Sequence, residues 1–325
     1  MGSPVFLLAD IGATNARFAL GCGGSLVKTA SLPTSRAGNV LELVEMARGE
    51  LGFDALAGSV IAVAGPVHNG RGAITNGTLE FDGATLGTLL NCRVTVVNDF
   101  HAIARSLPVL KRLRKIGGRQ QRTGPKAVVG PGSGLGMAVL MGGSNGWLVL
   151  PSEGGHADMA PGTPLEQEVL RILLDEHEQV SWETVLSGPG LVNLSRAVCV
   201  LWGTTPQEVT PEWITRSGVG AAEPICHQVL ELFFGILGGA AGNLALTVCA
   251  QGGVYIGGGI VPRLEEFAVT SSLRRRFDER GTLGDYAEQI PLYLILDENP
   301  GLVGALQILA GADMITNTDA MDGGR

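Results

Sequence analysis

The chain has 325 residues, a mass of 33.7 kDa, 45% hydrophobic residues and a net charge of −8 at pH 7. This length exceeds the usual size of one domain, so we expect two domains with buried cores. The acidic balance argues against a nucleic-acid partner, because affinity for nucleic acid comes largely from Lys and Arg that neutralise backbone phosphates.

The first half of the chain predicts an antiparallel meander followed by alternating helices and strands. Short β-rich runs separated by Gly, Asn or Ser predict the strands, and apolar residues at helical spacing predict the helices. In chain order, the expected elements are strands at 5–12, 16–22 and 26–32, a helix at 39–51, a strand at 59–67, a further helix, and a strand leading into a helix across 94–107.

The second half repeats this order of elements, which predicts a second α/β lobe. The expected elements are strands at 126–134, 135–143 and 146–155, helices from about 164 to 250, a strand at 252–260, a helix around 264–277 and a strand at 291–297. The polar stretch 111–126 lies between the two halves and is the best candidate for a linker or a lobe insertion.

One apolar segment, Ile225–Ala250, is long enough to resemble a membrane span. It carries His227, Gln228 and Glu231, which would be expensive in hydrocarbon, and it lacks basic flanks. We therefore expect a buried core helix and no association with a membrane. The five cysteines form no Cys-x-x-Cys pair, so we expect reduced thiols in a cytoplasmic protein.

Two glycine-rich turns join predicted strands. Asp10 ends an apolar strand and precedes a tight reversal at Gly12–Asn15, where backbone N–H groups can meet phosphate oxygens. Gly132–Gly136 forms a similar turn in the second half. Each turn by itself is equally compatible with an ordinary β-hairpin. Neither matches the P-loop, which ends in Gly-Lys-Ser/Thr, nor the dinucleotide fingerprint, which needs a helix after the glycines.

A strand that ends at Asn98 and Asp99 enters a helix through Phe100. Asp99 is compatible with two roles. It can cap the helix, or it can be a carboxylate at the carboxyl end of a strand, where open α/β sheets bind ligands, and accept a proton from a substrate hydroxyl.

Seven motifs together resemble those of the bacterial glucokinase family, the ATP-dependent hexose kinases of the hexokinase and actin superfamily. They occur in the family's order and at approximately its spacings: DIGATNARFAL, NDFHAIA, GPGSGLGMA, EGGHADMAP, VLSGPGLVNL, GGVYIGGGIVPR and DENPGLVGA. The resemblance implies a two-lobed α/β fold of the ribonuclease H-like, hexokinase/actin type with a central cleft. We assign the small lobe to 1–110 and 300–325 and the large lobe to 111–299.

The resemblance also implies roles for individual residues in the phosphorylation of D-glucose to glucose 6-phosphate, with ATP and Mg²⁺ as cofactors. Asp99 is the expected general base, and Asp10 is expected to orient Mg²⁺ through water. The residues expected to bind the sugar between the lobes are Asn98, Asp99, Glu153, His156 and Glu183. The residues expected to bind ATP are Asp10, Gly12, Thr14, Asn15, Gly132, Ser133, Gly134, Gly257, Gly258 and Gly259.

Sugar binding also explains the polar loop around Glu153 and His156 better than metal binding does, since a lone loop histidine is more often a hydrogen-bonding residue than a ligand. The two glycines of this loop are expected to let it approach the sugar ring. The sequence departs from the family pattern at Ala13, where glycine is usual. A positive φ at that position would be strained by the Cβ atom.

Several alternatives remain open. A kinase for mannose, fructose or glucosamine, or a non-catalytic sugar sensor on the same fold, would carry similar motifs. A sugar-responsive repressor would need a helix-turn-helix, and we expect none ahead of the strand that begins at Val5. The related repressor and kinase family usually has a cysteine-rich zinc motif beside its sugar-site histidine, and no cysteine follows His156 here. From the habit of the family we expect a homodimer.

Overall fold

The structure is a computed structural model that describes residues 3–75, 77–119, 123–143, 146–221 and 223–319. Its strands are β1 (Val5–Ile11), β2 (Asn15–Cys22), β3 (Ser25–Pro33), β4 (Gly58–Val63), β5 (Val67–His68), β6 (Arg71–Ala73), β7 (Glu80–Asp82), β8 (Val94–Asn98), β9 (Leu113–Gly117), β10 (Lys126–Pro131), β11 (Leu135–Gly143), β12 (Gly146–Ser152), β13 (Val254–Ile256) and β14 (Leu292–Ile295).

The helices alternate with these strands and are concentrated after β12. They are α1 (Val40–Leu51), α2 (Gly83–Leu90), α3 (Asp99–Ser106), α4 (Pro164–Leu174), α5 (Trp182–Val185), α6 (Gly188–Leu201), α7 (Pro211–Val219), α8 (Pro224–Thr247), α9 (Glu265–Thr270), α10 (Leu273–Asp278), α11 (Gly284–Gln289) and α12 (Pro300–Asp319). Four short 3-10 helices are η1 (Thr34–Arg36), η2 (Gly154–His156), η3 (Val261–Leu264) and η4 (Gly281–Leu283).

The chain divides into two compact units. Unit 1 comprises Met1–Lys111, Gly143–Pro151 and Asp297–Arg325, and unit 2 comprises Arg112–Gly142 and Ser152–Leu296. The lobes expected from the sequence, 1–110 with 300–325 and 111–299, remain a prediction. Residues 320–325 of that small lobe lie outside the described part of the chain.

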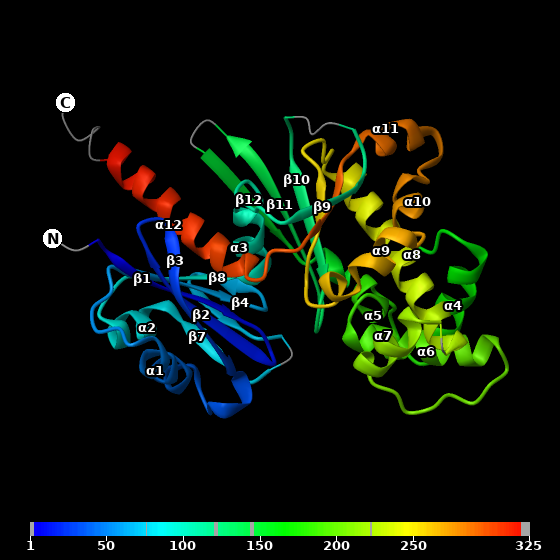
Figure 1. Ribbon diagram of the computed structural model, residues 1–325, viewed down its shortest axis with the longest axis horizontal. Coiled ribbons are helices and arrows are strands. Elements are labelled where there is room, and N and C mark those ends of the chain that lie inside the picture. The colour runs from blue at the N-terminus through cyan, green and yellow to red at the C-terminus, as the bar shows by residue number, and fades with distance from the viewer. Residues whose placement is uncertain (1–2, 76, 120–122, 144–145, 222, 320–325) are drawn as a thin grey trace. The chain divides into compact units, whose positions relative to one another are not determined.

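Unit 1 contains a five-stranded sheet with the strand order β3-β2-β1-β4-β8 (Figure 1). Successive side chains of a strand point to opposite faces, and β1 follows this rule. Leu7 and Ala9 pack in one core cluster with Leu43 of α1, whereas Leu8 packs in another with Leu302 of α12. The meander, α1 and β4 confirm the elements expected from the sequence, while the small sheet β5-β6-β7 was not expected.

Helix α12 continues the chain beyond the last expected strand and packs on α3. A Cβ atom at Gly304 would lie 1.6 Å from the carbonyl oxygen of Ala102. Only glycine therefore permits this approach of the two helices, because no side chain separates their backbones.

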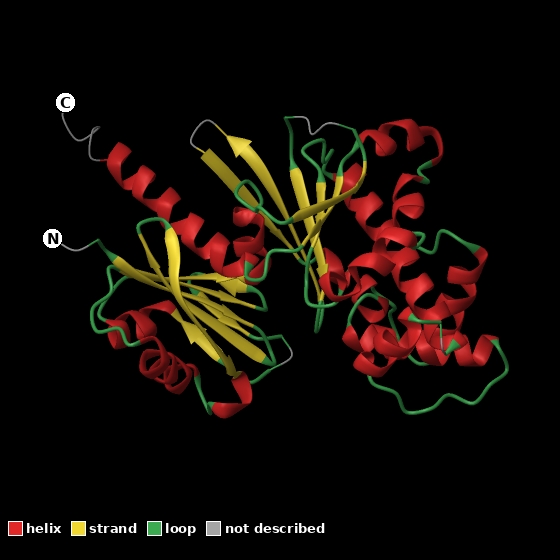
Figure 2. Cartoon of the chain, viewed as in Figure 1, coloured by secondary structure: helices red, strands yellow, loops and turns green. Residues whose placement is uncertain are grey.

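Unit 2 contains the neighbouring strands β11-β10-β13-β14-β9, in this order, and its helices gather beside them (Figure 2). Helix α8 packs against α6, α7 and α10. By length and composition α8 is the one helix among the described residues that could cross a membrane, but 78% of its most apolar window is buried in the structure. A Cβ atom at Gly238 would lie 2.2 Å from the carbonyl oxygen of Leu273. This close packing is that of the expected core helix.

The expectation that 111–126 is a linker is wrong for its first part. Leu113–Gly117 forms β9, which pairs antiparallel with β14 at the edge of the sheet. The basic residues that suggested a linker are typical of an edge strand, because charged side chains discourage pairing with another chain. Residues 120–122 of this stretch lie outside the described part of the chain. The single helix expected around 264–277 is instead α9 and α10, separated at Ser271 and Ser272.

Candidate active site

The first glycine-rich turn follows β1 in unit 1. The N–H of Gly12 donates to the carbonyl of Asn15 at 3.0 Å, which closes the reversal into β2. Thr34 fixes the outer side of the turn, since its N–H donates to the carbonyl of Thr14 and its hydroxyl to the carbonyl of Ala13. Thr14 and Asn15 are exposed. The exposed Thr14 and Asn15 of this turn are therefore accessible to a ligand.

The strain considered for Ala13 is absent. Among the described non-glycine residues, positive φ occurs at Asn69, Asn91, Ala221 and Cys249, and not at Ala13. The alanine Cβ therefore carries no backbone penalty in this turn.

Asp10 lies at the end of β1, where its side chain is 18% exposed. Burial raises the pKa of Asp10 above its ordinary value of 3.8, and the nearby Arg17 opposes this shift. The ion pair between the Arg17 and Asp10 side chains is long, 3.8 Å. A Cβ atom at Gly301 would lie 2.6 Å from a carboxylate oxygen of Asp10, so the first turn of α12 packs closely against this group. Asp10 is a mostly buried carboxylate whose charge is only weakly neutralised by Arg17.

The cap of α3 is Asn98. Its Oδ1 accepts from the N–H groups of Phe100 and His101, and its Nδ2 donates to the carbonyl of Gly65 at 3.1 Å. The Oδ1 of Asp99 lies 2.9 Å from the same N–H of Phe100. A side-chain amide has two donor hydrogens and two acceptor lone pairs, so the described bonds leave Asn98 one N–H available to a ligand. The cap role proposed for Asp99 belongs mainly to Asn98.

Parallel strands bring the first turn and Asn98 to the same edge of the sheet in unit 1. Ile11 of β1 pairs with Val63 of β4, and Val63 pairs with Asn98 of β8. This is the carboxyl edge of the three parallel strands, where α/β sheets bind ligands.

The second glycine-rich turn, Gly132–Leu135, connects β10 and β11 in unit 2. The N–H of Gly132 donates to the carbonyl of Gly134 at 2.8 Å, and the N–H of Leu135 donates to Oε2 of Glu183 at 2.7 Å. Among the described residues, no hydrogen bond uses the N–H groups of Ser133 or Gly134. These two groups and the exposed Ser133 hydroxyl are suited to phosphate oxygens.

The Gly257–Gly259 segment lies beside the second turn. Gly258 has φ +82°, and its Cβ would lie 2.2 Å from the carbonyl oxygen of Pro131. Glycine at 258 is therefore a requirement of the fold. At the exposed Gly259 a Cβ would meet nothing within 4 Å, so this position leaves open space for a ligand.

Glu153 and His156 lie in a loop that begins at Ser152 and forms η2. Both side chains are exposed, and the N–H of His156 donates to the carbonyl of Glu153 at 3.0 Å. Gly155 between them is buried, and its Cβ would lie 2.1 Å from the carbonyl oxygen of Leu135. This glycine is required by the protein's own backbone, a different reason from the approach to a sugar ring that we expected.

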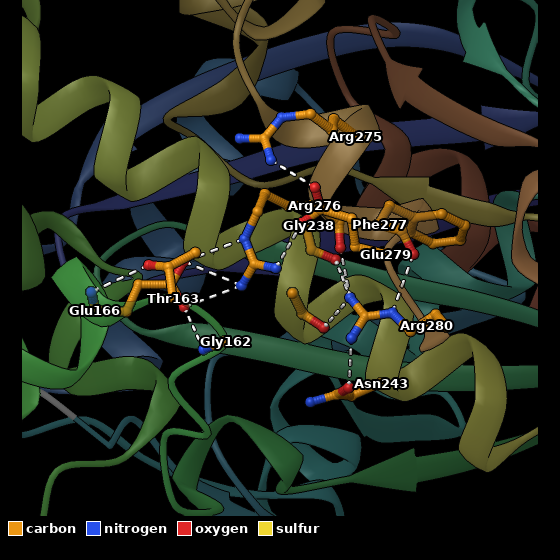
Figure 3. A network of polar contacts seen from close by, with 11 residues as sticks. Gly162, Thr163, Glu166, Gly238, Asn243, Arg275, Arg276, Phe277, Glu279 and Arg280 are labelled. Carbon is orange, nitrogen blue, oxygen red and sulfur yellow. Dashed lines mark hydrogen bonds and ion pairs between the residues drawn. The ribbon is translucent and has the colours of Figure 1, made fainter. Parts of the chain in front are cut away.

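A polar network fixes the chain just after this loop, and we did not expect it from the sequence (Figure 3). Glu166 accepts from Nε and Nη2 of Arg276 at 3.0–3.2 Å, with side-chain exposures of 4% and 6%. Glu166 also accepts from the N–H of Gly162 at 2.6 Å. Arg280 donates to Asn243 of α8. The run of three arginines in α10 was the available signal, but spacing alone does not distinguish a buried arginine from an exposed one.

A family model and two curated relatives agree on one family. A family model described as glucokinase matches residues 7–312. The glucokinase of Saccharophagus degradans is 38% identical over 309 residues, which cover 92% of this chain and 96% of that protein. The glucokinase of Aromatoleum aromaticum is 40% identical over 319 residues, with 94% and 95% covered.

Among solved structures, that of a glucokinase from an Antarctic psychrotroph is 33% identical, with a TM-score of 0.82. The match covers 94% of this chain and 99% of that one. These likenesses confirm the family resemblance and the α/β, hexokinase/actin-type fold expected from the sequence.

Proposed function

The chain belongs to the glucokinase family, and we propose that it transfers the γ-phosphoryl group of ATP to the 6-hydroxyl of D-glucose. The products are glucose 6-phosphate and ADP. The observation that carries this proposal is the family match over residues 7–312, because it includes every expected site residue.

In this proposal, Asp99 accepts the proton of the 6-hydroxyl as the sugar oxygen bonds to the γ-phosphorus and the bond to the leaving ADP oxygen breaks. The remaining N–H of Asn98 donates to a sugar hydroxyl. Glu153, His156 and Glu183 bind the other hydroxyls, since carboxylates and imidazole form strong hydrogen bonds with them.

Three backbone elements bind ATP, two at its phosphates and one at its adenosine. Gly12, Thr14 and Asn15 supply the first turn, and the N–H groups of Ser133 and Gly134, with Gly132, supply the second. Gly257–Gly259 accommodates the adenosine. Backbone N–H groups fixed before the reaction stabilise the charge that spreads over the transferred group at little reorganisation cost.

The residues present also fit a Mg²⁺ ion held indirectly. Among the described residues, no group of three or more His, Cys, Asp or Glu side chains could hold a metal directly. Asp10 is a mostly buried carboxylate, and its ion pair with Arg17 is 3.8 Å long, so a nearby cation would favour its charged form. We propose that Asp10 orients Mg²⁺ through water. When bound, Mg²⁺ neutralises charge on the phosphates.

The decisive experiment is a panel of glucose, mannose, fructose and glucosamine with ATP and Mg²⁺, scored by formation of the sugar phosphate. Glucose as the preferred substrate would support the proposal. Preference for another hexose would favour the first alternative, and glucose binding without turnover would favour a sugar sensor.

We also propose a domain organisation, a cellular location and an oligomeric state. The proposal takes 1–110 with 300–325 and 111–299 as the functional lobes. The five free cysteines support a cytoplasmic location, where thiols stay reduced. A homodimer is proposed from the family resemblance. The exposed Trp147, Leu148 and Leu150 of β12 supply apolar surface for such an interface, and light scattering on the purified protein tests it.

A further inference from the structure

The short segment 180–188 of unit 2 is hydrogen-bonded to two separate parts of the candidate site. At its start, it is bonded to the chain just after Glu153 and His156. The N–H of Met159 donates to the carbonyl of Val180, and the N–H of Trp182 donates to the carbonyl of Ala157, both at 2.9 Å. An isolated β-bridge joins Asp158 and Ser181. The loop that contains Glu153 and His156, called the sugar loop below, is therefore hydrogen-bonded to this segment through its backbone.

The other end of the segment is hydrogen-bonded at two points to the second glycine-rich turn, Gly132–Leu135, which is the second phosphate turn of the proposed function. Oε2 of Glu183 accepts the N–H of Leu135 at 2.7 Å, and the N–H of Gly188 donates to the carbonyl of Gly132 at 2.8 Å. The Ser187 hydroxyl donates to the carbonyl of Glu183, which fixes the backbone between these two contacts. One segment thus holds both ends of the turn Gly132–Leu135.

The side chain of Glu183 fits closely against the turn. A Cβ atom at Gly134 would lie 2.4 Å from Oε2 of Glu183, so glycine at 134 makes room for this carboxylate. Among the described residues, Oε1 of Glu183 has no hydrogen-bond partner. One oxygen is used by the turn, and the other is available to a sugar hydroxyl.

A carboxylate beside a phosphate site repels the phosphate. An uncharged acceptor would hold the N–H of Leu135 without this repulsion. The turn alone therefore does not explain a charged side chain at position 183. A strong hydrogen bond to a sugar hydroxyl does explain it. We propose that Glu183 is a positioning residue for the second phosphate turn as well as a sugar ligand, so that one carboxylate connects the two binding sites. This inference rests on the proposed function.

The test separates the two roles of Glu183 by substitution. Glu183→Gln keeps an oxygen acceptor for the N–H of Leu135 but removes the charge, whereas Glu183→Leu removes the acceptor. Glu153→Gln is the matched control, because it alters the exposed side chain of the sugar loop without touching the turn. Binding of ADP with Mg²⁺ and binding of glucose are measured separately by titration calorimetry, together with KM for ATP and kcat.

For ADP, we expect Glu183→Leu to weaken binding roughly ten- to a hundredfold, the range for losing a hydrogen bond to a charged group. Glu183→Gln should bind ADP at least as well as the parent does, because it keeps the acceptor and removes the repelling charge. Glu153→Gln should bind ADP as well as the parent does, and KM for ATP should follow the same order. For glucose, all three variants should bind more weakly. Unchanged ADP binding in Glu183→Leu, or equal losses of ADP binding in Glu183→Leu and Glu153→Gln, would overturn the inference.

Two checks keep the result decisive. If circular dichroism shows that Glu183→Leu does not fold, Glu183→Ala makes the same comparison without placing an apolar group in the turn. If the parent binds ADP and glucose but forms no glucose 6-phosphate, the proposed function fails, while the order of ADP affinities still decides the role of Glu183.

Discussion

Arg276 and Glu166 form an ion pair inside unit 2, in which Nε and Nη2 of the guanidinium contact the carboxylate at 3.0–3.2 Å. Both side chains are almost fully buried. The pair joins α10 to the start of α4, and Glu166 also accepts from the N–H of Gly162, close to the loop that contains Glu153 and His156.

We expect Arg276→Met to lower the free energy of unfolding by about 3–5 kcal/mol, since it leaves the Glu166 carboxylate buried without its partner. Its neighbour provides the control. Arg275 pairs with Glu279 at the surface, with side-chain exposures of 62% and 44%, so Arg275→Gln should cost at most about 1 kcal/mol.

Urea unfolding followed by tryptophan fluorescence measures both variants. This probe reports mainly on unit 2, which contains Trp182, Trp202 and Trp213. Similar losses in the two variants would mean that the buried pair has no special importance for stability.

Asp99→Asn is expected to keep the fold and glucose binding but to lower kcat by at least roughly 10²- to 10⁴-fold, because the amide preserves shape and removes the proton acceptor. The cap of α3 remains, since Asn98 supplies it. Calorimetry with glucose and a coupled assay for ADP give the two measurements. Turnover close to that of the parent would show that Asp99 is not the base.

Asp10→Asn is expected to stabilise the protein at neutral pH while it abolishes most activity. Because burial raises the pKa of Asp10 above 3.8, the native state binds its proton more tightly than the unfolded state does. The parent therefore carries the full cost of the buried charge above its raised pKa. That cost declines as the pH falls through this pKa towards 3.8.

Thermal unfolding of the parent and Asp10→Asn, without nucleotide, across pH 4 to 8 checks this sign. The stability advantage of the variant should be largest at neutral pH and should shrink in acid. An advantage that grew on acidification would contradict a raised pKa.

For sugar specificity, we expect kcat/KM for glucose to exceed that for mannose and fructose by at least roughly tenfold, since a misplaced hydroxyl leaves a polar partner unsatisfied. Glu183→Gln should lower the ratio of kcat/KM for glucose to that for the other two sugars. The fold-change in this ratio should exceed the fold-change in ATP affinity. Steady-state kinetics with the three sugars decide the matter. Equal use of all three by the parent, or a preference untouched by the substitution, would show that the residues that select the sugar are assigned wrongly.

Much of the fold follows from local patterns. Short β-rich runs predicted β1, β2 and β3, and the long apolar run predicted a buried α8. Strand β9 was missed because its basic residues also suit a linker, and only pairing with β14 distinguishes the two. The break between α9 and α10 was missed because two serines in a helical pattern do not by themselves end a helix.

The sequence by itself determined the family and the candidate residues, because ordered glycine and carboxylate motifs can be recognised without coordinates. Tertiary structure decided what each residue contacts. Only the fold shows that Asn98 caps α3, that Gly155 makes room for a backbone carbonyl and that Glu183 holds the N–H of Leu135. Leu135 and Glu183 are 48 positions apart. Contacts over such distances depend on how elements pack, and no local pattern along the chain records them.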